Sequence, residues 1–231
     1  MSIKSDKYPT EIINLPSQGW FYPAGHPLAT GQIEMYYMTA KHEDILTSRN
    51  LINRGVVIDK LLEALIADPN VNINDILLGD KGGLIVASRI LGYGKEYPIS
   101  FKCPSCNIKV DITLDLQELT DKQCPYFTDE YRGKNIFPFQ LPLSKKTIMF
   151  KFLTHGDENG IQSELSALKK AARIEVSNES TLRLRRSIVA VDGDDDQENI
   201  RTFVEMMPAK DARAFREHLR NVSPDVDLTT M

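Results

Sequence analysis

The chain has 231 residues, of which 42% are hydrophobic and 26% are charged, as in an ordinary globular protein with enough apolar residues for a core. Its formal net charge of −4 and a pI near 5.6 give no general positive field, which makes nucleic acid a poor partner. No apolar run approaches the roughly 18 residues of a membrane span, and no signal-peptide pattern opens the sequence, so we expect a soluble protein.

Residues 1–31 predict an extended arm, because proline and glycine recur too often for a helix to form. The arm contains three consecutive aromatic residues, Trp20, Phe21 and Tyr22, between two prolines. Large apolar rings in an arm of this kind must cover a surface. That surface belongs either to a neighbouring subunit or to the helical block of the chain itself.

Residues 32–94 predict this helical block, which a short strand precedes. Thr39 can cap the first helix and Gly55 follows it, while Asp80 can cap the third. The second helix places its apolar residues on one face. The three predicted helices span residues 39–53, 56–67 and 80–91.

Residues 95–154 predict a β-hairpin region. Apolar and polar residues alternate from Tyr97 to Leu114 on both sides of a Cys-Pro-Ser-Cys sequence. This pattern is typical of a half-buried antiparallel hairpin with the cysteine pair at its tip. A second β segment is predicted over residues 137–143 and 147–153.

Residues 155–231 predict a C-terminal helical region, with helices over 157–176, 180–190, 197–207 and 209–221. The acidic run around Asp194 lacks the glycine and glutamate that a calcium loop requires, so we expect a turn with one aspartate capping the next helix. The segment order predicts the α+β class: a helical block, central antiparallel β hairpins with a Cys-Pro-Ser-Cys tip, and C-terminal helices.

The cysteine pair is the most specific local signal. Cys103 and Cys106 on a tight turn match one half of a tetrahedral zinc site. Cys124 is the only further cysteine, and His42 or His155 can complete four ligands if the fold brings one of them close. A structural zinc ion and a metal-free turn both remain open, and no other cofactor is predicted.

No pattern of an active site is present. The four histidines fall on separate predicted elements, and no serine lies in a nucleophile elbow. Residues 168–187 are locally basic, which usually indicates a solvated helix face and suits an acidic partner protein as well as nucleic acid. We therefore predict a binding protein and not an enzyme, with a zinc-stabilised nucleic-acid-binding module as an alternative.

Short motifs follow one another in a distinctive order along the chain. They are Leu15-Pro16-Ser17, Phe21-Tyr22-Pro23, Met38-Thr39-Ala40-Lys41, Ile76-Leu77-Leu78-Gly79-Asp80, Gly92-Tyr93-Gly94, Cys103-Pro104-Ser105-Cys106, Val191-Asp192-Gly193 and Met207-Pro208-Ala209-Lys210-Asp211. From about Leu15 to Leu228, this series resembles the baseplate hub family of T-even-type contractile-tailed bacteriophages.

The resemblance implies a structural or assembly protein of the tail baseplate hub, whose partners are other hub or tail proteins. It places the protein in the host bacterial cytoplasm during assembly and, if it stays in the particle, in the virion tail baseplate. A transient assembly chaperone absent from the virion is the alternative, and the oligomeric state stays open. The candidate interface residues are Trp20, Phe21, Tyr22, Phe203 and Phe215.

Overall fold

The N-terminal arm contains a strand in the computed structural model, which describes residues 8–172 and 179–228. Strand β1, Thr10–Asn14, pairs antiparallel with β2, Gln32–Tyr36. The backbone amide of Leu15 donates to the carbonyl of Gly31 at 2.8 Å and closes the intervening loop. The predicted strand before the helical block is confirmed as β2, while β1 was hidden by the prolines and glycines around it.

The helical block has four helices where three were predicted: α1 (Ala40–Thr47), α2 (Arg49–Asn53), α3 (Val57–Leu65) and α4 (Leu78–Tyr93). Thr39 is confirmed as the first N-cap, and its backbone amide donates to Nδ1 of His42 at 3.0 Å. The predicted helix over 39–53 breaks at Ser48, where ψ is 104° and therefore extended. Asp80 was expected to cap the third helix, which is wrong, because α4 begins two residues earlier at Leu78.

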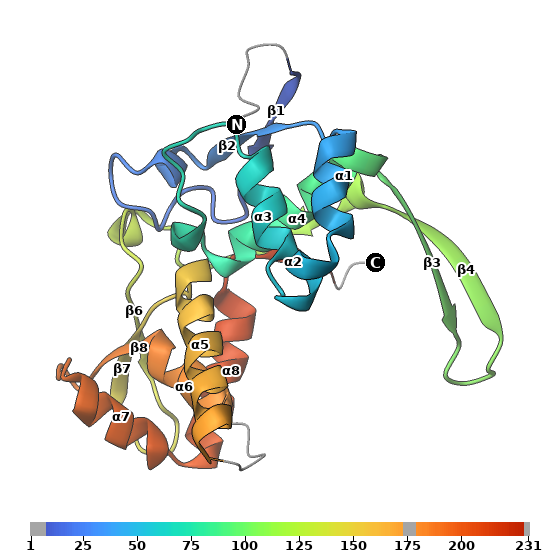
Figure 1. The fold of residues 1–231 in the computed structure, drawn as a ribbon. Helices are drawn as coiled ribbons and strands as arrows, with labels where there is room; N and C mark the ends of the chain where they lie inside the picture. Colours follow the sequence, from blue (N-terminus) through green and yellow to red (C-terminus); the bar gives the residue numbers. More distant parts are fainter. Residues whose placement is uncertain (1–7, 173–178, 229–231) are drawn as a thin grey trace.

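The predicted antiparallel hairpin with the cysteine pair at its tip is confirmed, but it is less buried than expected. Strand β3, Glu96–Lys102, pairs with β4, Lys109–Asp115, over seven residues each. The hairpin projects from the rest of the molecule as a two-stranded ribbon (Figure 1). Every residue of the two strands is at least partly exposed, so the expectation of a half-buried hairpin is wrong.

A three-stranded antiparallel sheet lies in the other half of the molecule (Figure 1). Its strands are β6 (Phe137–Gln140), β7 (Thr147–Phe150) and β8 (Ile188–Val191), in that order. The predicted second β segment is confirmed as β6 and β7. The predicted helix over 180–190 is wrong at its end, because the apolar run from Ile188 to Val191 pairs with β7 instead. A two-residue pair of β5 (Thr120–Asp121) and β9 (Val226–Asp227) joins distant parts of the chain.

The C-terminal helices are α5 (His155–Ala172), α6 (Glu179–Ser187), α7 (Gln197–Glu205) and α8 (Ala209–Val222). Residues 173–176 of the first predicted helix lie outside the described residues. Asp196 caps α7, with its carboxylate accepting from the amides of Glu198 and Asn199 at 3.0 and 2.9 Å, which confirms the predicted aspartate cap.

Short 3-10 helices complete the described elements: Pro27–Thr30, Ile73–Asp75, Leu116–Glu118 and Asp129–Tyr131. The α+β class is therefore confirmed, with several small antiparallel sheets among the helices. Among the described helices, none is both long and apolar enough to cross a membrane.

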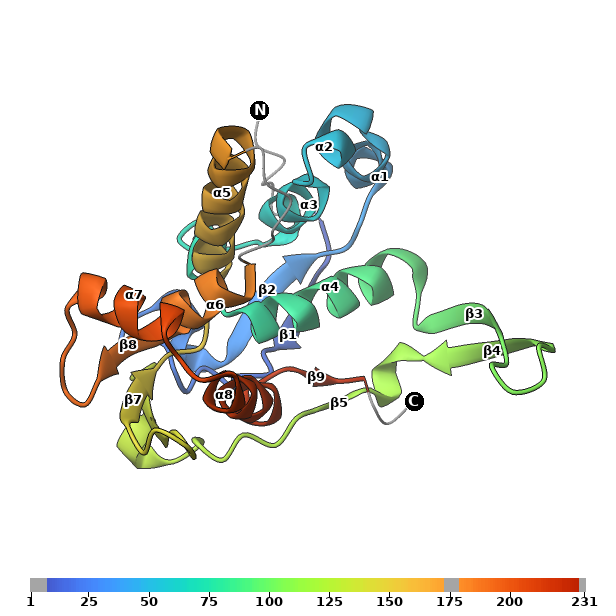
Figure 2. The ribbon, with the colours of Figure 1, turned by 90° about the horizontal axis from the view of Figure 1, so that it is seen from below.

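One apolar cluster extends from Leu15 in the arm to Val222 at the end of α8. A smaller cluster of Ile161, Leu165 and Leu182 joins α5 to α6. Helix α4 lies across the middle of the molecule, between the other helices of its block and α8 (Figure 2). The four predicted segments thus contribute to a common core, and their assignment as separate domains stays a prediction.

Candidate functional site

The arm is fixed to the helical block by one buried carboxylate. Asp80 accepts hydrogen bonds from the amide and hydroxyl of Ser17, at 2.8 and 2.7 Å, and from the hydroxyl of Tyr22 at 2.6 Å. Ser17 and Asp80 are fully buried. Burial raises the pKa of Asp80, and the hydrogen bonds from Tyr22 and Ser17 oppose that rise. The carboxylate is therefore an internal anchor, since its acceptor sites face the arm and not solvent.

Three of the five candidate interface aromatics lie inside this core. Phe21, Tyr22 and Phe215 are 3%, 5% and 0% exposed. Phe21 packs against Phe137 and Phe152, with ring centroids 5.1 and 5.2 Å apart. In this conformation these rings cannot reach a neighbouring subunit, and the arm covers its own chain, which is the alternative that the sequence left open.

The other two candidates are half-buried and keep part of their surface free. The Trp20 ring stacks on Phe127 at 6.0 Å, and the guanidinium of Arg132 lies 3.7 Å from its centroid. The ammonium of Lys146 lies 5.7 Å from the centroid of the Phe203 ring. Both rings carry a cation on one face, an arrangement that fixes an aromatic side chain at a surface.

The three cysteines do not form one site. Cys103 and Cys106 lie at the tip of the β3–β4 hairpin, whereas Cys124 is buried in the main core, where burial raises its pKa to about 11. Within residues 8–172 and 179–228, no group of three or more histidine, cysteine, aspartate or glutamate side chains is placed to hold a metal ion. The described structure therefore does not bring Cys103, Cys106 and Cys124 together, and a metal site that includes them stays a prediction.

His155 instead belongs to a charged trio that joins three helices. The ammonium of Lys81 lies 2.5 Å from Asp59 and 2.9 Å from Nδ1 of His155, and Nε2 of His155 lies 3.2 Å from Asp59. Burial and the nearby Lys81 lower the pKa of His155, although Asp59 opposes the shift. The three groups satisfy one another across α3, α4 and α5, which is a structural role.

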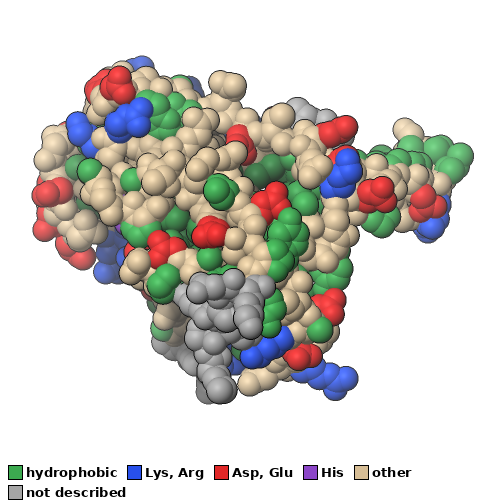
Figure 3. Space-filling view, turned by 90° about the horizontal axis from the view of Figure 1, so that it is seen from above, with side chains coloured by type: hydrophobic (Ala, Val, Ile, Leu, Met, Phe, Trp, Pro, Cys, Tyr) green, Lys and Arg blue, Asp and Glu red, His purple; other side chains and the backbone are tan. Residues whose placement is uncertain are grey.

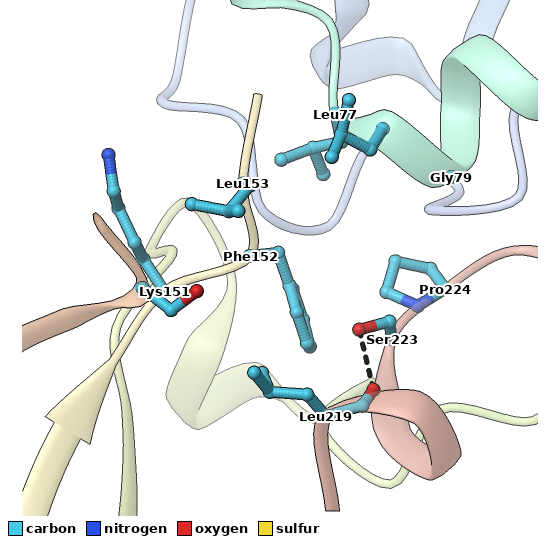
Figure 4. Close-up of a pocket in the computed structure, with 10 residues that line it drawn as sticks. Leu77, Gly79, Lys151, Phe152, Leu153, Leu219, Ser223 and Pro224 are labelled. Carbon is cyan, nitrogen blue, oxygen red and sulfur yellow. Dashed lines mark hydrogen bonds between the residues drawn. The ribbon is translucent and has the colours of Figure 1, made fainter. Parts of the chain in front are cut away.

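A cavity of about 130 Å³ lies between the start of α4, the segment after β7 and the end of α8 (Figure 4). Its walls are mainly apolar and include Leu77, Phe152 and Leu219, while Ser223 donates to the carbonyl of Leu219 at 2.7 Å. Ligand pockets usually measure about 300 to 1,000 Å³ and carry converging polar groups. This space is a packing gap where the two halves of the molecule meet.

The basic region of the sequence is partly neutralised. Arg183 forms two hydrogen bonds to Glu158 at 2.6 and 2.7 Å, and Arg185 contacts Glu164 at 2.6 Å. The side chains of residues 169–178, which supply the other basic groups, lie outside the described part of the chain. Arg183 and Arg185 therefore pair with carboxylates of α5, which neutralises part of the positive charge of this region.

The β3–β4 hairpin carries an apolar face that the described chain covers only in part: Ile99, Val110 and Leu114 are half-buried, and the guanidinium of Arg89 lies 5.6 Å from the centroid of the Tyr97 ring. Directly opposite pairs place six side chains on this face: Tyr97 with Leu114, Ile99 with Ile112, and Phe101 with Val110. Tyr97, Phe101 and Ile112 are 43%, 47% and 40% exposed. Figure 3 shows hydrophobic atoms on the projecting hairpin, with acidic and basic side chains beside them. We call these six residues the apolar ribbon face.

The comparisons with known proteins identify the family. The model of the T4 bacteriophage base plate protein family matches residues 13–230 of this chain. The chain belongs to this family. No curated protein and no solved structure gives a significant match.

Motifs far apart in the sequence of this baseplate protein meet in its structure. Ser17 from the first motif contacts Asp80 from the fourth. An added side-chain carbon at Gly92 would lie 2.4 Å from the sulfur of Met38, so these two motifs also pack closely. Motifs that are distant in sequence thus contact one another and help to hold the elements of the fold together.

The sequence prediction missed two structural features of the baseplate protein. Asp211 is fully buried, and its carboxylate accepts from the amides of Leu143 and Ser144 at 2.7 and 2.9 Å. The apolar ribbon face was seen as alternation but assigned to the core. Only the unusual length of the hairpin between two helical regions could have pointed to a surface role.

Proposed function

We propose that this protein is a structural component of the baseplate hub of a contractile phage tail and acts by binding other hub or tail proteins, without catalysis. Its family membership supports a role in the baseplate. The hub is the finer assignment and follows from the ordered motifs. On this proposal the protein assembles in the host bacterial cytoplasm and then resides in the virion tail.

The observation that carries the binding role is the apolar ribbon face. A two-stranded hairpin is marginally stable in water unless its apolar face packs against something. Exposed contiguous apolar surface on a soluble protein usually marks an interaction site. The ribbon face has both properties, and its six side chains stand clear of the core, where a neighbouring subunit can cover them.

A pair of adjacent substitutions tests the binding role. Ile112→Asp puts a charge on the apolar ribbon face, while Thr113→Asp puts the same charge on the opposite, polar face at an equally exposed position. We expect Ile112→Asp to reduce co-purification with co-expressed hub proteins at least about tenfold, because an interface would bury an unpaired charge. Thr113→Asp should bind like the wild type.

Circular dichroism and thermal unfolding should show that both variants fold, since neither position belongs to the core. An Ile112→Asp protein that folds and still joins the hub normally would disprove the ribbon interface. Mass spectrometry of purified particles separates a component from a transient chaperone. Stoichiometric amounts in the particle support the component, and complete absence overturns it in favour of the chaperone.

A further inference from the structure

The hairpin tip has the local geometry of a metal-binding knuckle. The amide of Cys103 donates to the carbonyl of Ile108 at 2.9 Å, and the amide of Asn107 donates to the carbonyl of Cys103 at 2.8 Å. Asn107 takes a left-handed conformation with φ of 58°, which reverses the chain. The backbone amides of Cys106 and Ser105 are directed at the Cys103 sulfur. The turn thus presents the sulfur in the way that a metal-binding knuckle does.

The tip supplies only half of the ligands that a structural zinc ion requires. Such ions are almost always held by four ligands in a tetrahedron. Within the described residues no third metal-binding side chain joins Cys103 and Cys106, and Cys124 lies in the core. The hairpin also carries its tip away from the body (Figure 1). The missing ligands therefore have to come from another molecule.

The charges beside the tip suit an anionic metal centre. Lys102 lies directly opposite Lys109 in the last register pair before the turn. Lys109 also pairs with Asp111 at 3.1 Å. A zinc ion bound by four thiolates is a dianion, and it would attract the ammonium groups of both lysines next to it. This observation is independent of the turn geometry.

We propose that the hairpin tips of two copies of this chain share one zinc ion, with Cys103 and Cys106 of each copy as its four ligands. A two-fold axis through the ion supplies the second, identical cysteine pair. The ion joins the two copies at their tips and leaves the apolar ribbon face of each copy free for another partner. Four thiols lose four protons as the ion binds, which makes the affinity fall at acid pH.

This inference goes beyond the proposed function, because it names a second copy as the partner of the hairpin tip. It is tested on the purified full chain alone, kept reduced and stripped of metal, and then titrated with zinc. We expect the mass from light scattering to double at about half an equivalent of zinc per chain. A chelator should restore the monomer. Cobalt in place of zinc should give the strong visible absorption of a tetrahedral tetrathiolate site.

Matched cysteine variants locate the ligands. Cys106→Ser should abolish both zinc retention and the dimer, whereas Cys124→Ser makes the same change in the core and should keep both. Circular dichroism should show that Cys106→Ser folds, because the core does not include the tip. Lys102→Glu should weaken zinc binding several-fold by adding a negative charge beside the dianion.

Several outcomes overturn the inference: one zinc per chain in a monomer, no retained zinc, or a zinc-dependent dimer that survives Cys106→Ser. Zinc binding that requires a hub protein with its own cysteines overturns the second copy as partner. Each of these leaves the hub-binding result for Ile112→Asp untouched. Conversely, a zinc dimer together with normal hub entry of Ile112→Asp refutes the proposed function alone.

Discussion

The N-terminal arm and the β3–β4 hairpin both consist of two antiparallel strands with aromatic residues, which lie in the loop of the arm but on the strands of the hairpin, and the two regions use these rings differently. In the arm, the buried carboxylate of Asp80 holds Ser17 and Tyr22, and the neighbouring Phe21 lies in the core. In the hairpin, six apolar side chains stay outside the core. The difference teaches that aromatic content alone does not tell whether a segment belongs to the core. A buried polar group that holds the segment, such as Asp80 in the arm, does indicate this.

We expect the largest effect on the free energy of unfolding when one phenylalanine from each region is replaced by alanine. Phe21→Ala should lower the free energy of unfolding by about 3 to 5 kcal/mol, because it leaves a cavity among packed rings. Phe101→Ala should change it by less than about 0.5 kcal/mol, because its ring is exposed. Urea unfolding of the two variants measures both values. Equal losses would contradict the contrast between arm and hairpin.

A smaller effect tests the polar anchor. Asp80→Asn keeps the shape of the side chain but removes the charge that accepts from Ser17 and Tyr22, so we expect a loss of about 2 kcal/mol. Asp111→Asn makes the same change on the hairpin, where the side chain is 65% exposed, and should be nearly neutral. Hydrogen exchange should show a loosened arm in the first variant only. An arm that stays fully protected would rule out the anchor.

The smallest expected effect is a dependence of the free energy of unfolding on pH, which comes from histidines outside the hairpin. Burial lowers the pKa of His42, His155 and His218 below the ordinary value of 6.5, while residues 96–115 contain no histidine. As the pH falls below about 6.5, the unfolded chain takes up protons first. The stabilisation is therefore complete above that pH and is lost as the pH falls through the lower folded-state values.

Urea unfolding at a series of pH values measures this loss, and a His155→Asn variant should show a shallower dependence. An unchanged slope in that variant would mean that the trio with Asp59 and Lys81 does not hold a neutral imidazole.

Most elements could be predicted from the sequence because their signals are local. The Thr39 cap, the amphipathic second helix and the aspartate cap at Asp196 each depend on residues within a few positions. The exact break at Ser48 and the strand at Ile188 could not be predicted in this way. Tertiary pairing decides the strand, since Ile188 lies opposite Phe150 in the sheet. The structure gives no comparable partner for the break at Ser48.

The sites were harder to predict because their members are distant in sequence. Ser17 and Asp80 are separated by 63 positions, and their hydrogen bond leaves no trace in either local pattern. Alternation from Tyr97 to Leu114 correctly indicated an apolar face, but periodicity does not say whether the chain itself or another molecule covers it. Whether the chain itself covers the apolar face depends on the direction in which the hairpin projects.

The length of the hairpin has a further consequence for assembly. Each of its strands has seven residues, and at about 3.3 Å per residue the ribbon holds its tip about 23 Å from the body. Inserting or deleting one residue pair would move the following side chains to the opposite face, because side chains alternate along a strand. A change of two pairs keeps the apolar residues on one face and should alter the distance from body to tip by about 7 Å.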